Sequence, residues 1–344
     1  MKRENEMEKL LTFCVPSYNS EAYLSHALDS LIVGGNNLEV LIIDDGSKDN
    51  TLEIAKDYEK RYPDIFKAIH QENKGHGGAI NTALSYATGD YFMVLDSDDW
   101  VDEKGLHALL ENIDKSKEPD LILMPYMYRH SYDSEEGRLI RYNHSVKPGV
   151  LCTWRNVKKF GSSRNLTLHS VVYKTSMLRE ANIVLPEHCF YEDNYFIYAP
   201  LPHVKKLIYI DVPMYKYLLG REGQSMQTAT LMKRNENLIR AASLAFNSVD
   251  LKTLKKENKY LYRLMKHQLV MMVCSPLLYT SLKEKKISKQ EKAAFIASMK
   301  SDNLKQYHML RRHPYVYFPS CNNSFGKASA KVMLWAVRKY GMID

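Results

Sequence analysis

The stretch GDYFMVLDSDDW, residues 89–100, joins an apolar segment to a cluster of carboxylates. The apolar segment runs from Tyr91 to Leu95 without alternation, which is typical of a strand buried on both faces of a parallel sheet. Three aspartates follow it, namely Asp96, Asp98 and Asp99. Open α/β sheets bind their ligands at the carboxyl ends of their strands. The stretch therefore predicts a parallel sheet with a polar site at its carboxyl edge.

The aspartate cluster has two interpretations. Carboxylates this close together repel each other unless a cation or hydrogen-bond donors compensate. Mg²⁺-type ions bind through one or two carboxylates together with substrate phosphates, so a metal–phosphate site is one interpretation. The other is that Asp98 or Asp99 caps a following helix, a position at which aspartate is favoured. The cluster alone does not decide between them.

Strand and helix patterns alternate before this stretch. Short apolar runs predict strands at 11–15, 38–43 and 66–70, and amphipathic spacing predicts helices at 21–31, 51–62 and about 75–87. Asn19 or Ser20 is a suitable N-cap for the first helix. The short connections predict a doubly wound sheet of right-handed βαβ units. Residues 120–128 are expected to supply a further strand.

The pattern changes in the second half of the chain. Segments after about Ser131 are short and mixed, and from Lys233 onward the sequence predicts helices. No apolar window has the length that a bilayer span needs. The nearest, Leu269 to Leu282, is short and contains Pro276, so a buried helix is the better interpretation.

Composition indicates a globular protein of a reducing compartment. Apolar residues make up 45% and charged residues 26%, which is ordinary for a folded chain. The five cysteines are scattered without a Cys-x-x-Cys pair, which argues against a disulfide framework or a zinc site and fits the cytoplasm. The first ten residues are charged and lack the apolar core of a signal peptide.

The positive charge lies in the C-terminal third. Residues 251–344 contain 19 Lys and Arg against 5 Asp and Glu, so their balance is 19 − 5 = +14. The net charge of +8 leaves 8 − 14 = −6 for residues 1–250. This asymmetry favours an anionic membrane surface or an anionic polymer as a partner, with a solvated basic face as the alternative. Nucleic acid is disfavoured, because the chain has no zinc finger, RNA-binding signature or dense basic helix.

Each predicted strand of the first half is followed by a polar loop. The first loop offers the ring of Tyr18 beside Pro16 and Asn19, and the second offers Asp44 and Asp45. Asp-Gly-Ser is also a favoured turn composition, so a plain turn is the alternative for the second loop. The third, residues 73–78, is glycine-rich and could present backbone N–H groups to an anion at a helix N-terminus. It matches neither a Rossmann fingerprint nor a P-loop. Together the loops predict a nucleotide-binding crevice.

Four motifs carry a family resemblance. Val15-Pro16-Ser17-Tyr18-Asn19, Asp44-Asp45-Gly46-Ser47, Asn73-x-Gly75-x-x-x-Ala79-x-Asn81 and Asp96-Ser97-Asp98 resemble, in this order, the family 2 glycosyltransferases of the GT-A fold. The resemblance is strong over about the first 130 residues. Two later segments extend it, Tyr191-Glu192-Asp193-x-x-Phe196 and Arg221-Glu222-Gly223-Gln224-Ser225-Met226. Nothing is carried over beyond about Thr230.

The resemblance implies a GT-A type doubly wound mixed sheet flanked by helices over residues 1–230. The sequence pattern and charge predict a mainly helical basic region over residues 231–344. Within the first part, residues 1–130 would bind the nucleotide and residues 131–230 the acceptor. The implied activity is an inverting transfer of a sugar from a nucleoside diphosphate sugar, with a UDP-sugar expected, to an acceptor hydroxyl. The implied setting is bacterial surface polysaccharide or glycoconjugate synthesis on the cytoplasmic side. The basic, aromatic-containing C-terminal third adds the expectation that the chain is peripheral on the inner face of the membrane.

The resemblance also implies roles for individual residues. Base and ribose would be held by Pro16, Tyr18, Asn19 and Asp45 with Asp44 nearby, and the donor site would further include Asn73, Gly75 and Ser97. Asp98 would bind Mn²⁺ or Mg²⁺ at the diphosphate, and Asp96 would support the ribose and the metal. Arg221 and Ser225 would cover the donor phosphates. Asp193 would be the catalytic base.

Several of these residues have a simpler alternative. Glu192 and Asp193 could be an acidic pair at a helix N-terminus, and Arg221 could form a surface ion pair. Contact with acceptor or phosphate is expected of His169, Trp100 and Glu192, although His169 could equally be structural and Trp100 could seal the core.

Two other functions remain open, a nucleotidyltransferase and a non-catalytic nucleotide-sugar-binding module. A nucleotidyltransferase is expected to carry a glycine-rich, basic loop straight after the first strand, which residues 16–19 do not supply. Intact Asp96, Asp98, Asp193 and Arg221 speak against a non-catalytic module.

Overall fold

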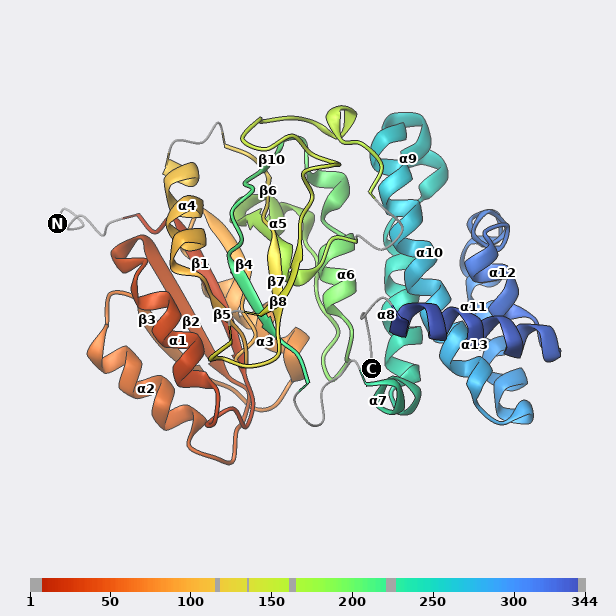
Figure 1. The fold of residues 1–344 in the computed structure, drawn as a ribbon, viewed down its shortest axis with the longest axis horizontal. Helices are drawn as coiled ribbons and strands as arrows, with labels where there is room; N and C mark the ends of the chain where they lie inside the picture. Colours follow the sequence, from red (N-terminus) through yellow and green to blue (C-terminus); the bar gives the residue numbers. More distant parts are fainter. Residues whose placement is uncertain (1–7, 115–117, 135, 161–164, 221–226, 340–344) are drawn as a thin grey trace. The chain divides into compact units, whose positions relative to one another are not determined.

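The computed structural model describes residues 8–114, 118–134, 136–160, 165–220 and 227–339. The chain forms two compact units. The α/β unit comprises Met1–His188 and Pro202–Leu219, and the helical unit comprises Cys189–Leu201 and Gly220–Asp344. Figure 1 labels most helices and strands of both units.

A seven-stranded mixed sheet forms the centre of the α/β unit. Its order is β10-β6-β9-β4-β1-β2-β3, and β9 runs antiparallel to both of its neighbours, whereas the other pairs are parallel. Strand β1 is buried along its whole length, as a strand covered on both faces must be. The strands are β1 (Leu11–Ser17), β2 (Leu38–Asp44), β3 (Phe66–His70), β4 (Tyr91–Val94), β6 (Leu121–Leu123), β9 (Val171–Lys174) and β10 (Leu207–Tyr209).

The first three helices cover the parallel part of this sheet. α1 (Leu24–Ile32) and α2 (Thr51–Arg61) pack against each other, and α2 lies on β2 and β3, whereas α3 (Gly75–Tyr86) lies on β1 and β2. The chain reverses direction across the sheet between β3 and β4, so a right-handed crossover places α3 on the opposite face. Figure 1 shows this arrangement. The predicted doubly wound α/β fold is confirmed for these elements.

A second, four-stranded sheet has the order β5-β11-β7-β8. It consists of β5 (Trp100–Val101), β7 (Tyr126–Arg129), β8 (Gly137–Ile140) and β11 (Tyr215–Leu218). The single strand expected at 120–128 is therefore wrong, because β6 belongs to the first sheet and β7 to the second. The division falls at Pro125. The N–H of Met124, just before Pro125, donates to the carbonyl of Ser170, next to β9 of the first sheet. The carbonyl of Pro125 accepts from the N–H of Met214, next to β11 of the second sheet.

Short helices complete the α/β unit. They are α4 (Glu103–Asp114), α5 (Thr175–Ala181) and the 3₁₀ turns η1 (Gly35–Asn37), η2 (Trp154–Asn156) and η3 (Leu168–Ser170). A further turn, η4 (Leu201–His203), lies where the chain returns to this unit.

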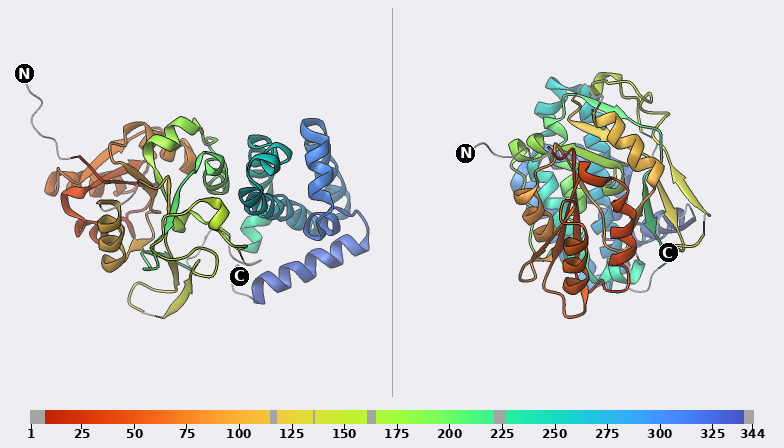
Figure 2. Two further views of the ribbon diagram at one scale, coloured as in Figure 1. Left: turned by 90° about the horizontal axis from the view of Figure 1, so that it is seen from above. Right: turned by 90° about the vertical axis from the view of Figure 1, so that its left-hand side faces the viewer.

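The helical unit has no strand among its described residues (Figures 1 and 2). The segment Leu269 to Leu282 lies in α10, where Leu269, Val273 and Pro276 are buried, so the predicted buried helix is confirmed. None of the described helices combines the length and apolar character that crossing a bilayer requires. The helices are α6 (Asp193–Tyr198), α7 (Thr228–Lys233), α8 (Asn235–Ser248), α9 (Leu251–Glu257), α10 (Lys259–Leu282), α11 (Lys285–Arg311), α12 (Pro314–Ser320) and α13 (Ser324–Lys339).

The two units do not divide at residue 230. Residues 189–201, 220 and 227–230 fall in the same unit as the C-terminal helices. The domains expected at 1–230 and 231–344 stay a prediction about which parts of the chain fold independently.

Two expected helix caps are wrong. Helix α1 begins at Leu24 with Tyr23 at its N-cap position and no side-chain cap, because Asn19 and Ser20 use their side chains to bond neighbouring loops. Asp99 caps no helix, since β5 follows it directly. The side-chain bond at the start of α4 comes from Asp102, whose Oδ1 accepts from Gly105 N at 3.2 Å.

Candidate functional site

Four loops follow the adjacent strands β4, β1, β2 and β3 of the first sheet. We call them loop 1 (residues 18–23, after β1), loop 2 (45–50, after β2), loop 3 (71–74, after β3) and loop 4 (95–99, after β4). All four strands are parallel, so the loops leave the same edge of the sheet. Tyr18, Asn19, Asp45, Asn73, Asp96 and Ser97, all expected at the donor from the sequence, therefore lie in loops at one edge of the sheet.

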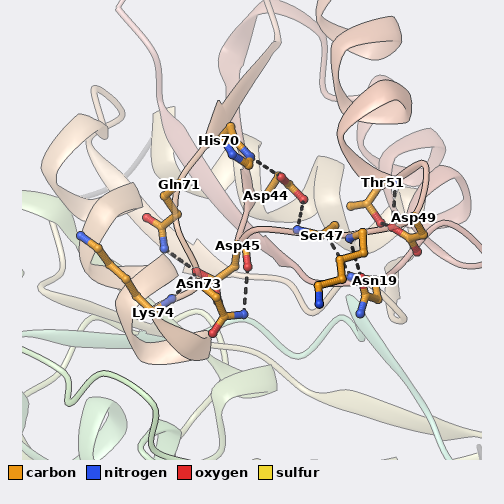
Figure 3. Close-up of polar contacts among 11 residues, drawn as sticks. Asn19, Asp44, Asp45, Ser47, Asp49, Thr51, His70, Gln71, Asn73 and Lys74 are labelled. Atoms are coloured by element: carbon orange, nitrogen blue, oxygen red, sulfur yellow. Dashed lines mark hydrogen bonds and ion pairs between the residues drawn. The ribbon is translucent and has the colours of Figure 1, made fainter.

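Loop 1 is tied to loop 2 through Asn19 (Figure 3). The Asn19 N–H donates to Ser47 Oγ at 3.0 Å, and its Oδ1 accepts from Lys48 N at 2.9 Å. Asn19 has a φ of 49°, a left-handed conformation that asparagine tolerates better than most residues. Tyr18 beside it is 50% exposed, whereas Pro16 is buried in β1. The ring of Tyr18 is thus accessible for stacking.

Asp45 joins loop 2 to loop 3 and to the start of α3 (Figure 3). Its Oδ1 accepts from Gln71 Nε2 at 2.7 Å and from Lys74 N at 2.8 Å, and its Oδ2 accepts from Gly75 N at 2.8 Å. Asn73 donates to the Asp45 carbonyl at 2.9 Å. Gly75 has a φ of 76°, which favours glycine at this position. The anion at the α3 N-terminus is therefore the chain's own carboxylate.

Asp44 is buried and bonded on both of its oxygens. Its Oδ2 lies 2.6 Å from His70 Nδ1, and its Oδ1 accepts from Ser47 N at 3.3 Å. These bonds give Asp44 a role in shaping loop 2. Its expected place near the donor stays a prediction.

Loop 4 is bonded to loop 1 and to α3. Ser97 Oγ lies 2.8 Å from Ser20 Oγ, and Asp96 Oδ1 lies 3.0 Å from His76 Nε2. His76 was not among the site residues expected from the sequence. Its position immediately after Gly75, within the glycine-rich segment, is the signal that could have identified it.

Asp99 connects the first sheet to the second. It is fully buried, and its two oxygens accept from Tyr215 OH at 2.7 Å and from Leu218 N at 2.8 Å. The Tyr215 hydroxyl also accepts from Asp96 N at 3.1 Å. Burial, followed by the charges of Asp98 and Asp96, raises the pKa of Asp99 well above its usual range. Within the aspartate cluster, the hydrogen bonds of Asp99 therefore serve mainly to hold the two sheets together.

One group of side chains has the composition of a metal site. Ligand atoms of Asp96, Asp99 and His169 lie within 4.8 Å of one another. His169 Nδ1 is buried and lacks a hydrogen-bond partner within the described structure. Burial lowers the pKa of His169 to about 4, partly opposed by the charge of Asp96, so the imidazole is neutral near pH 7, as a metal ligand must be. This donor set fits a divalent cation.

Asp98, the metal ligand expected from the sequence, is not in that group. It is half-buried, and its carbonyl accepts from Tyr132 OH at 3.1 Å. Asp98 follows Asp96 by two residues in the same loop, so its role as a ligand stays a prediction.

Aromatic rings surround two of the residues expected at the acceptor. Trp100 is only 6% exposed and packs against His26 and Tyr132, with ring centroids 5.1 and 5.0 Å away. This environment favours its role in the core. His169 stacks on Tyr217, with centroids 4.3 Å apart and an interplanar angle of 23°.

The expected catalytic base lies in the helical unit. Asp193 is the first residue of α6 and is half-buried, and its Oδ1 accepts from Asn194 Nδ2 at 3.0 Å. Glu192 is buried at the N-cap position. Arg221 and Ser225 lie outside the described residues. The roles of all four stay predictions.

The chain is thus an α/β protein with linked polar loops and a candidate metal site at one sheet edge. The family model described as glycosyl transferase family 2 matches residues 12–180. The minor teichoic acid biosynthesis protein GgaB of Bacillus subtilis (strain 168) is 26% identical over 297 residues, which are 82% of this chain and 31% of that protein. The poly(ribitol-phosphate) beta-glucosyltransferase of Bacillus spizizenii is 30% identical over 235 residues, which are 65% of this chain and 34% of that protein.

The fold resembles a solved structure as well. S. aureus TarS 1-349 in complex with UDP-GlcNAc superposes with a TM-score of 0.58 at 18% identity, over 88% of this chain and 90% of that one. The chain spans about a third of the length of the two curated relatives. The match of residues 12–180 to the glycosyl transferase family 2 model, together with this structural likeness, confirms the predicted resemblance, the GT-A fold and the enzyme class, a glycosyltransferase.

Proposed function

We propose that this chain is a metal-dependent, inverting glycosyltransferase that uses a UDP-sugar and glycosylates a hydroxyl of a bacterial surface polymer. One observation carries the proposal: the four loops are bonded to one another and end at Asp96, beside Asp99 and His169. The names of the two curated relatives favour an acceptor of the teichoic acid type, a polymer of polyol phosphates.

In this proposal, the donor nucleotide lies across loops 1 to 4. The exposed ring of Tyr18 stacks on the base. Loops 1 to 3 and the first residue of α3 meet the ribose through Asn19, Asp45, Asn73 and Gly75. The bonds of Asp44 and Asp45 keep these loops in place before the donor arrives, which lowers the entropy lost on binding. Ser97 and Asp96 lie at the diphosphate end.

A divalent ion, Mn²⁺ or Mg²⁺, would supply Lewis-acid stabilisation of the leaving diphosphate. Asp98 and Asp96 would hold it, and His169 and Asp99 are near enough to Asp96 to contribute. Arg221 and Ser225 would cover the donor phosphates, as the family resemblance implies. Guanidinium groups suit this task because their planar fork matches phosphate oxygens.

Asp193 is proposed to accept the proton of the acceptor hydroxyl. The acceptor oxygen forms a bond to the anomeric carbon while the bond from that carbon to the diphosphate breaks, so the configuration inverts. The proton passes to the Asp193 carboxylate, and UDP leaves with the bonding electrons. A general base of this kind contributes about 10²- to 10⁴-fold to the rate.

The reaction is proposed to take place on the cytoplasmic side, at the inner face of the membrane. The excess of +14 in residues 251–344 supports a location against anionic lipid. Nucleic acid is not a proposed partner.

The test is UDP release from a panel of UDP-sugars with and without Mn²⁺, after a thermal-shift screen has selected the donor. We expect release to need the metal, and Asp98→Ala and Asp193→Ala to lower it by about 100-fold or more. Asp64→Ala, which removes an exposed aspartate of the α/β unit, is the control and should release UDP normally. Unchanged release in both site variants would refute the assigned roles. Metal-dependent binding without release would instead indicate a non-catalytic module.

A further inference from the structure

Helix α13 has two apolar faces. One is buried, where Ala330 and Leu334 pack with Leu278 and Tyr279 of α10. The other is exposed: Phe325 is 57% exposed, Val332 64% and Trp335 61%. The spacings of seven and three residues place these three side chains on one side of the helix. An ordinary surface helix would carry polar residues there.

The exposed apolar side continues onto α12. The rings of Phe325 and Phe318 lie 5.3 Å apart, and those of Phe318 and Tyr317 lie 5.5 Å apart. Tyr317 is 44% exposed, and the guanidinium of Arg311 lies 5.8 Å from its ring centroid. The contacts therefore join α12 and α13 into one continuous surface within the helical unit.

This surface is positively charged throughout. Residues 303–343 contain seven Lys and Arg and no Asp or Glu. Lys327 and Lys331 are exposed on α13 one turn apart, and Lys331 is in turn one helical turn before Trp335. We name the set Tyr317, Phe325, Lys327, Lys331, Val332 and Trp335 the aromatic–basic face.

We propose that the aromatic–basic face docks onto an anionic phospholipid membrane. Trp, Tyr and Phe on one side of a helix enter the boundary between headgroups and acyl chains, and lysines beside them reach the anionic headgroups. A second copy of the chain fits less well, because symmetric pairing would oppose two surfaces without a carboxylate. A hydrated polyanion would leave the apolar side chains uncovered. The inference rests on the membrane location proposed above, but not on the donor chemistry.

The test is flotation of the full chain with vesicles of phosphatidylcholine alone or mixed equally with phosphatidylglycerol. We expect binding to the mixed vesicles only, weakened by salt because screening reduces the attraction of exposed charges. Phe325→Ser/Trp335→Ser and Lys327→Glu/Lys331→Glu should each weaken binding by about tenfold or more.

Two matched variants test whether the location matters. Lys285→Glu/Lys289→Glu makes the same charge change at the same spacing on α11, and Val184→Ser removes an apolar side chain that is 70% exposed in the α/β unit. Both should bind nearly as the unchanged chain does. Equal loss in the two lysine double variants would overturn the proposal, because net charge alone would then explain binding.

Other outcomes are equally decisive. Absence of binding to the mixed vesicles would overturn the proposal. A lower oligomeric mass of Phe325→Ser/Trp335→Ser than of the unchanged chain would also overturn it, because the aromatic–basic face would then be an interface between two copies of the chain. Thermal unfolding and UDP release of each variant report whether it is folded. A chain that floats but releases no UDP would refute the proposed function and leave the docking surface standing.

Discussion

His76 Nε2 lies 3.0 Å from Asp96 Oδ1, which ties the first turn of α3 to the aspartate cluster after β4. His76 lies in α3, which follows β3, and Asp96 lies in loop 4, which follows β4. Strands β3 and β4 are separated in the sheet by β1 and β2. The contact therefore links loop 4 to the helix that follows loop 3, at the two ends of the series of four loops. It also fixes the direction of the Asp96 carboxylate, because a carboxylate oxygen held by an imidazole has little freedom to rotate.

The first prediction is that His76→Ala weakens UDP-sugar binding by about fivefold to 100-fold, the effect of losing about 1–3 kcal/mol of hydrogen bonding to a charged group. His76→Gln, which keeps a donor on a side chain of similar reach, should recover part of the loss. Titration calorimetry with Mn²⁺ present measures both. His107→Ala on the exposed face of α4 is the control. Equal affinities for His76→Ala and the unchanged chain would remove His76 from the site.

A second prediction concerns the stability that Asp45 provides. Asp45→Asn replaces an acceptor oxygen with an NH₂ group that faces backbone or side-chain donors. We expect a loss of about 1–3 kcal/mol in the free energy of unfolding. Urea denaturation measures it, with Asp64→Asn on the surface as the control, expected within about 0.5 kcal/mol of the unchanged chain. Similar values for both variants would contradict the role of Asp45 as a connector of loops.

Tyr215→Phe is the third test, and it probes the link between the sheets. The hydroxyl both donates to Asp99 Oδ2 and accepts from Asp96 N, so its removal leaves two buried polar groups short of a partner. A loss of about 1–3 kcal/mol in stability is expected. Tyr217→Phe, on the same strand and with the ring stack on His169 kept, should lose less. Urea denaturation should therefore give a lower midpoint for Tyr215→Phe than for Tyr217→Phe, and the reverse order would contradict the role of Tyr215 as the link between the sheets.

The metal site gives a fourth prediction. Because burial lowers the pKa of His169 to about 4, this imidazole stays neutral from pH 6 to 8, and its protonation opposes metal binding only as the pH falls toward 4. His169→Ala should weaken Mn²⁺ binding by about tenfold or more at pH 7, measured by water proton relaxation. Unfolding of the variant is checked in parallel. Unaltered Mn²⁺ affinity would leave Asp98 and Asp96 as the proposed ligands and exclude His169.

Thiol labelling tests the core of both units. Burial raises the pKa of Cys189 to about 11 and of Cys274 to about 12, and raises that of Cys14 well above its usual range. The thiolate is the reactive species, so these three cysteines should resist iodoacetamide at pH 8 until the chain is unfolded in urea. Mass spectrometry of the digested chain identifies the labelled positions. Rapid labelling of Cys274 in the native chain would show that α10 is less buried than described.

The sequence predicts the first half of the fold well, because each of its elements is specified locally. The buried runs of β1 to β4 contain their own apolar signal, and the glycine-rich segment marks the start of α3. The second sheet is different. Strands β5 and β11 are more than one hundred residues apart in the sequence, and the two residues of β5, Trp100 and Val101, do not indicate with which strand they pair.

The sequence predicts where the candidate site lies better than it predicts the hydrogen bonds within it. Residue types at strand ends identify Asp45, Asp96 and Tyr18, since polar groups gather there in any such sheet. Which oxygen bonds which donor depends on the folded loops. For this reason His76 was missed, and the helix cap considered for Asp98 or Asp99 is instead made by Asp102.

The carboxylate of Asp45 has one more consequence. A helix N-terminus normally offers its partial positive charge to a bound phosphate, but in α3 the first N–H groups already face a negative charge of the chain itself. In the proposed reaction, the diphosphate of the donor would therefore find its counter-charge in the divalent ion and in cationic side chains. It follows that nucleotide and ion should load as a neutralised pair, so removing the ion with a chelator should abolish donor affinity as well as turnover.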